Sequence, residues 1–77
     1  MTNVEESELK VKQCDIITTQ IKDERMAVAT YHALAQLLSE SENPGVRGMA
    51  ILAEKIADDE QSHMKALEKL AQLHCPK

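Results

Sequence analysis

The sequence predicts an all-α protein, an antiparallel hairpin of two helices. Three observations indicate this fold. The 77-residue chain has only two glycines and two prolines, with no Phe, no Trp and one Tyr, and it is rich in Ala, Leu, Glu and Lys, which favour helices. Two long segments, about 9–40 and 44–74, carry apolar residues at alternating steps of three and four. One short polar segment separates them.

Length and charge restrict the partners. Without large aromatic side chains, two helices of this length cannot close a substantial core, so we expect a homodimer or a higher oligomer. The net charge of −4 and the absence of a basic cluster argue against nucleic acid. No run is apolar enough to span a membrane, and residues 1–20 lack the pattern of a signal peptide. We therefore expect a soluble, cytoplasmic protein without a membrane partner.

The hairpin is expected to occupy residues 9–77. Residues 1–8, MTNVEESE, are acidic and carry little periodicity, so both a capped helix start and a disordered tail are compatible with them. The segment 39–45, SESENPG, combines a helix stop with Pro44 at the first position of the next helix. A connection this short makes the two helices antiparallel neighbours.

The first helix has a regular stripe with one charged member. Its stripe consists of Cys14, Ile17, Ile21, Glu24, Val28, Tyr31, Ala35 and Leu38. A lone glutamate on such a stripe is more often an imperfection than a ligand. Glu24 alone therefore does not indicate a site.

The stripe of the second helix contains two ionisable residues. Its stripe runs Met49, Ala53, Ile56, Glu60, His63, Leu67, Leu70, which places a Glu-x-x-His pair at core positions. A buried carboxylate and a buried imidazole need partners, and a metal ion is the simplest one. Glu24 lies sixteen residues before Glu40, and Glu60 lies sixteen after Pro44, so both are about 24 Å from the turn. Convergence at one level favours a metal site of Glu24, Glu60 and His63.

One hairpin gives an incomplete set of ligands. Two hairpins related by a two-fold axis would form a four-helix bundle with four carboxylates and two imidazoles around one site. Hard oxygen ligands that can bridge two ions, with one nitrogen for each, suit iron or manganese, and zinc is a further candidate.

At these residues the sequence resembles the rubrerythrin branch of the ferritin-like superfamily. Glu24-Arg25-Met26-Ala27 followed by Tyr31 looks like that family's Glu-x-x-Ala-x-x-x-Tyr helix, and the segment 56–63, IADDEQSH, is similar to its Ile-Ala-x-x-Glu-x-x-His helix. The resemblance covers about residues 17–70. It implies that the hairpin dimerises into a ferritin-like four-helix bundle with a di-iron centre.

The chain departs from the full-length family. It has one helix pair where rubrerythrins and ferritins have two, and in this it resembles the encapsulated ferritins, which build their site between subunits. A rubredoxin-like Cys-x-x-Cys module is missing, and no cargo-targeting tail follows His74. Electron transfer from a built-in module is therefore not expected, and an encapsulating shell stays a possible partner without an evident targeting tail.

The resemblance implies oxidation of Fe(II) by oxygen or peroxide, as in a ferroxidase or peroxidase. It implies that Glu60 bridges the ions, that His63 is a terminal ligand, and that Glu24 is a terminal or chelating ligand. Tyr31 either hydrogen-bonds a ligand carboxylate or is a core tyrosine whose hydroxyl reaches solvent or backbone.

Two other functions stay open. In a helical interaction module without metal, Glu24, Glu60 and His63 would satisfy one another through hydrogen bonds. In a structural metal protein, the same residues would bind an ion for stability alone.

The remaining candidates are weaker. His32 is expected on the surface or between subunits, and Asp59 on a solvated face or at the entrance to the site. The helix rise places Cys14 and Cys75 near the open end of the hairpin, where a disulfide or a second metal site with His74 could form. Neither is favoured in a chain expected to be intracellular.

Overall fold

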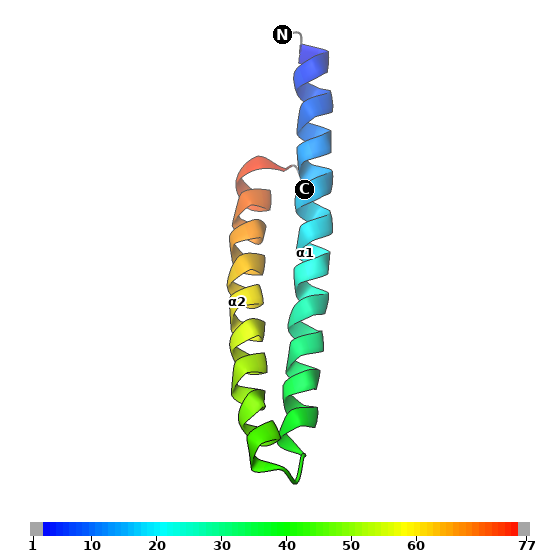
Figure 1. Cartoon of the computed structure of the whole chain (residues 1–77). Coiled ribbons are helices and arrows are strands. Elements are labelled where there is room, and N and C mark those ends of the chain that lie inside the picture. The colour runs from blue at the N-terminus through cyan, green and yellow to red at the C-terminus, as the bar shows by residue number, and fades with distance from the viewer. Residues whose placement is uncertain (1–2, 76–77) are drawn as a thin grey trace.

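The computed structural model describes residues 3–75, with side chains from residue 5 onward. It contains two antiparallel helices, α1 (Asn3–Ser39) and α2 (Pro44–His74), which lie side by side (Figure 1). The described residues contain no strand and measure 63 × 19 × 14 Å. The all-α class and the two-helix hairpin are confirmed.

Helix α1 is longer than the sequence indicates. It begins at Asn3, so the acidic residues 3–8 are helical, while Met1 and Thr2 lie outside the described residues. Figure 1 shows that the N-terminal part of α1 extends beyond the end of α2. In the described residues, neither helix is long and apolar enough to cross a membrane.

The turn is fixed by side chains that satisfy backbone groups. The Asn43 side-chain oxygen accepts hydrogen bonds from the backbone N–H groups of Gly45 and Val46, at 2.8 and 3.4 Å. Pro44 begins α2, where its missing N–H is not needed. The Arg47 guanidinium donates to two carbonyls of the turn at 3.0 and 2.9 Å. These contacts set the antiparallel direction of α2.

The face of α1 that contacts α2 is the predicted stripe. All eight of its members, from Cys14 to Leu38, are buried or half-buried. Three side chains of the whole interface are buried: Ala35 at 3%, Ala53 at 4% and Ala57 at 0% exposure. All three lie between the turn and the level of Glu24 and Glu60. Alanines at these positions let the two backbones approach closely.

The predicted stripe of α2 is only partly correct. Ala53, Glu60 and Leu67 do face α1, but Met49, Ile56 and Leu70 are 50%, 41% and 50% exposed. The buried and half-buried positions of α2 are Val46, Ala50, Ala53, Ala57, Glu60, Gln61, Met64, Leu67 and Ala71. Two stripes overlap on this helix, one that begins at Val46 and contains several alanines, and the predicted one that begins at Met49. The stripe with the alanines packs against α1 because small side chains let the two backbones approach more closely. The bulkier stripe, which includes His63, lies along the edge.

The open end of the hairpin is closed by a disulfide between Cys14 and Cys75, whose Cα atoms are 5.8 Å apart. Beside it, the His74 ring donates a hydrogen bond to the Gln13 side-chain oxygen at 2.6 Å. The helix rise predicts this proximity, but the pairing itself is contrary to the expectation from an intracellular location. A metal site of both thiolates with His74 is excluded while the disulfide is intact.

Candidate metal centre

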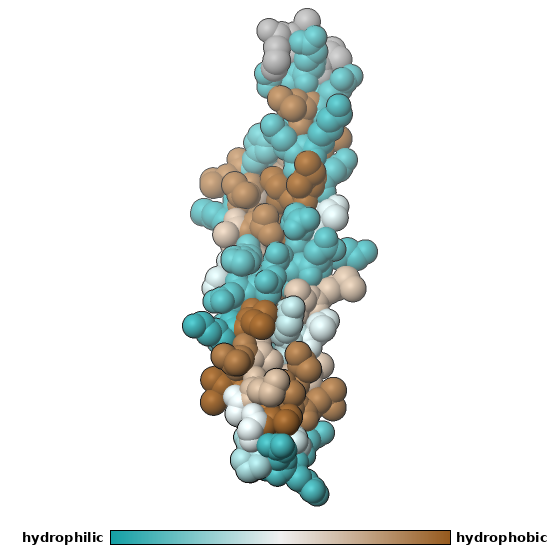
Figure 2. Space-filling view, in the orientation of Figure 1, coloured by the Kyte–Doolittle hydropathy of each residue, from teal (hydrophilic) through white to brown (hydrophobic). Residues whose placement is uncertain are grey.

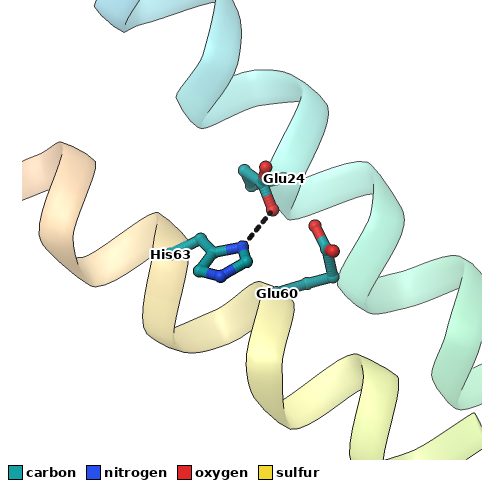
Figure 3. Close-up of side chains that lie close together, drawn as sticks. All are labelled: Glu24, Glu60 and His63. Carbon is teal, nitrogen blue, oxygen red and sulfur yellow. Dashed lines mark ion pairs between the residues drawn. The ribbon is translucent and has the colours of Figure 1, made fainter.

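Three ionisable side chains from the two helices meet midway along α2. Glu24 comes from α1, and Glu60 and His63 come from successive turns of α2; all three point into the space between the ribbons (Figure 3). One potential ligand atom from each lies within 4.8 Å of the others. The structure therefore brings together the three residues that the sequence places at one level.

The three residues differ in their exposure. The Oε2 atom of Glu24 lies 3.8 Å from Nδ1 of His63, which is an ion-pair distance but too long for a hydrogen bond (Figure 3). The Glu24 side chain is 18% exposed and that of His63 is 63% exposed, whereas Glu60 is half-buried. His63 is thus at the edge of the helix pair and not at a core position.

The Glu60 carboxyl group perturbs the titration of Glu24. The pKa of Glu24 is raised, first by a hydrogen bond with Glu60, then by loss of solvent, and then by repulsion from the Glu60 charge. The nearby His63 lowers this pKa and partly offsets the rise. Among the described residues, the Glu24 Oε2 atom is buried without a hydrogen-bond partner. A cation at this position would replace the proton of Glu24 and satisfy that oxygen.

The donor set fits a transition metal. Two carboxylates and one imidazole are ligands of iron, manganese and zinc. No other group of three His, Cys, Asp or Glu residues lies as close together in residues 3–75. Three protein donors leave several positions of a six-coordinate ion open, and the exposed His63 shows on which side the opening lies.

Two other predicted residues lie near the centre without contacting it. Tyr31 is half-buried, seven residues from Glu24, which is about 10 Å along α1. Its hydroxyl makes no hydrogen bond within the described part of the chain. Asp59 is exposed beside Glu60. Neither residue can be assigned to the centre from this geometry.

One contact was missed by the sequence reasoning. The exposed His32 ring donates to Glu54 at 3.0 Å, on the opposite side of the hairpin from His63. His32 lies eight residues before Glu40, and Glu54 lies ten after Pro44, so the same counting from the turn could have paired them. This pair is one imidazole and one carboxylate, too few to form a metal site.

The chain matches no family model, no curated protein and no solved structure. The candidate centre is therefore defined by its own geometry.

Proposed function

We propose that the chain binds iron between two copies of the hairpin and oxidises Fe(II) with oxygen or peroxide, as a ferroxidase or peroxidase of the ferritin-like type. The observation that carries the proposal is the buried Glu24 Oε2 atom, which has no hydrogen-bond partner in the described residues and faces Glu60 and His63. An acceptor left in this state costs stability, and a bound cation would remove that cost.

A second copy supplies what one hairpin lacks. The face of the hairpin that carries His63, here called the His63 face, also carries most of the exposed bulky side chains. These are Leu9, Ile16 and Leu34 of α1 and Met49, Leu52, Ile56 and Leu70 of α2. Helical spacing places each set on one edge, and the Gln13–His74 hydrogen bond shows that the two edges share a side.

The layout of the His63 face suits a two-fold partner. Figure 2 shows this face, with apolar side chains in two groups, one near the turn and one toward the open end, and a hydrophilic belt between them. The belt contains the metal-ligand candidates, which lie near the middle of α2. If a second copy is related by a two-fold axis that passes through the belt, the belts of the two copies face each other. The apolar group near the turn of each copy then covers the apolar group toward the open end of the other. Two sets of ligands then face each other.

Each residue has a distinct task in the proposed centre. Glu60 and Glu24 would supply negative charge that balances the cations, and Glu24, whose pKa is raised, must lose its proton for the ions to bind. His63 supplies the nitrogen donor from the rim. Bound iron would supply the one-electron chemistry with oxygen or peroxide that the side chains lack.

Tyr31 is a further member of the proposal. If its hydroxyl supports a ligand carboxylate in the dimer, Tyr31→Phe should slow Fe(II) oxidation without changing the fold. Unchanged oxidation in this variant would remove Tyr31 from the proposal.

A helical interaction module is the second candidate, because the same apolar face could receive a partner's helix. Under that function the three side chains would stay metal-free. Structural metal binding is a third outcome, in which iron binds but is not oxidised.

The test is an anaerobic Fe(II) titration of metal-free protein, followed by oxygen. We expect saturation near about one iron per chain and a near-ultraviolet ferric band after oxygen. Glu60→Ala should lose both, whereas Glu54→Ala, an exposed carboxylate on the same helix, should keep both. Binding without a band would leave a structural site. No binding to an intact dimer would leave the interaction module.

A further inference from the structure

The two halves of the hairpin are held together by different means. Between the turn and the candidate centre, Ala35, Ala53 and Ala57 are buried. Between the centre and the open end, no described side chain is buried, and the contacts of α2 beyond Glu60 are made by half-buried residues such as Met64 and Leu67. The turn half is thus closed by tight packing. The open half is packed more loosely and is also joined by the Gln13–His74 hydrogen bond and by one covalent bond.

This covalent bond is the Cys14–Cys75 disulfide. Apart from the turn, it is the one covalent connection between the helices, and it closes a loop of 61 residues in sequence separation. A disulfide across so long a loop removes much of the freedom of the unfolded chain. Cys75 follows the last residue of α2 in an extended conformation, so the disulfide fixes the position of the whole C-terminal end.

The disulfide is also accessible. Both cysteines are half-buried, and they line a hollow of about 390 Å³ whose wall includes Lys10 and Val11 of α1. A small thiol can enter a hollow of this size. The attacking species is a thiolate, and the Lys10 ammonium would favour its approach.

We propose that Cys14 and Cys75 form a thiol–disulfide exchange site for a dithiol reductant, and that opening it releases residues 64–75 of α2 while the turn half stays paired. This inference does not rest on the proposed metal function.

The exchange is a balanced two-electron step. A thiolate of the dithiol attacks one sulfur, the S–S bond breaks, and the other cysteine leaves as a thiolate. The second thiol of the dithiol then attacks the mixed disulfide as its thiolate and displaces the remaining cysteine. Two electrons pass to the protein, the dithiol becomes a disulfide, and its two protons end on the two cysteines or in solvent.

The first test is the rate of reduction of the native, full-length protein by dithiothreitol without denaturant, followed by mass spectrometry of alkylated thiols. Attack through the hollow gives a rate that rises linearly with dithiothreitol concentration. Lys10→Glu should slow it, whereas Lys12→Glu, outside the hollow, should not. A rate that reaches a plateau at the unfolding rate, or an unchanged rate in Lys10→Glu, would overturn the exchange site.

The second test is amide hydrogen exchange of the oxidised and reduced protein. We expect exchange in residues 64–75 to accelerate by about tenfold or more, with protection retained around the buried alanines, and the melting temperature to fall by about 10 °C or more. The double variant Cys14→Ser/Cys75→Ser should show the hydrogen exchange and the melting temperature of the reduced protein, and dithiothreitol should change neither. Unchanged exchange, or loss of protection along the whole chain, would overturn the release of α2.

Discussion

Glu24 and His63 lie 3.8 Å apart, yet they belong to different surfaces of the molecule. The Glu24 carboxylate is enclosed between the helices, with 18% of its side chain exposed, and the His63 ring stands on the edge at 63%. The candidate centre is therefore anchored inside one hairpin and open toward the His63 face. The buried contacts that stabilise the hairpin are therefore distinct from the exposed His63 side chain, which would complete the set of ligands.

His63→Ala should weaken metal binding without weakening the hairpin. An exposed side chain contributes little packing, so the free energy of unfolding of the metal-free protein should change by about 0.5 kcal/mol or less. Loss of a nitrogen donor should lower iron affinity by about tenfold or more. Isothermal titration under anaerobic conditions measures the affinity, and urea unfolding measures the stability.

The control for this variant is His32→Ala, which removes a histidine that is also exposed, at 46%, on the opposite side. It should leave iron affinity unchanged. Equal losses in both variants would mean that iron binds to surface histidines and not to the candidate centre.

The raised pKa of Glu24 predicts a pH dependence of stability. Because its pKa is raised above the usual value near 4.5, the folded state holds the proton more tightly than the unfolded state. This contribution is present in full below the usual carboxyl pKa and is lost as the pH rises through the raised folded value. Metal-free wild type should therefore lose stability over that range.

Glu24→Gln should remove this part of the pH dependence. The amide keeps the shape but cannot ionise, so the variant should be more stable than metal-free wild type at neutral pH and similar to it in acid. Thermal melts across the range give the difference. Glu68→Gln, on the exposed surface of α2, is the matched control, and the prediction fails if it gives the same profile.

Ile56→Glu should prevent the proposed dimer from forming. Ile56 is 41% exposed on the His63 face, seven residues before His63, and a charge there would be buried between two copies. Ile51→Glu introduces the same charge at a residue that is 74% exposed and points to the other side of α2. Analytical ultracentrifugation should show monomers for the first variant and dimers for the second, with iron binding lost only in the first.

Ala57→Leu should destabilise the hairpin. Ala57 has no exposed surface, and a larger side chain would force the helices apart one turn from Glu60, at a cost of about 1–3 kcal/mol. Ala33→Leu, at an exposed position of α1, should be close to neutral. Chemical unfolding of both variants checks the difference, and similar stabilities would show that the alanine contact is not tight.

The α1 interface could be predicted from the sequence, since the stripe from Cys14 to Leu38 is interrupted by one charged residue only, although Ala27 beside it is half-buried as well. On α2, the stripes that begin at Val46 and at Met49 have the same period and share Ala53, Glu60 and Leu67. Hydrophobicity favours the bulkier stripe, but close approach of the backbones selects the one with alanines. His63 could not be placed correctly for this reason.

The approach of the three ionisable residues was predictable because it depends on the helix rise and the short turn alone. The Cys14–Cys75 pairing was not, since proximity in a hairpin does not decide the oxidation state of two thiols. An expected cellular location is weaker evidence on the oxidation state than geometry is on proximity.

The unequal length of the helices also has a practical consequence. Eleven residues of α1, from Asn3 to Gln13, precede the disulfide, and they carry that end about 16 Å beyond it. A fluorophore or affinity tag joined there would stand clear of the belt and of the paired helices. A label attached at Cys75 would instead break the disulfide, because that residue is paired with Cys14. For immobilisation or single-molecule work, α1 is the end by which to hold this protein.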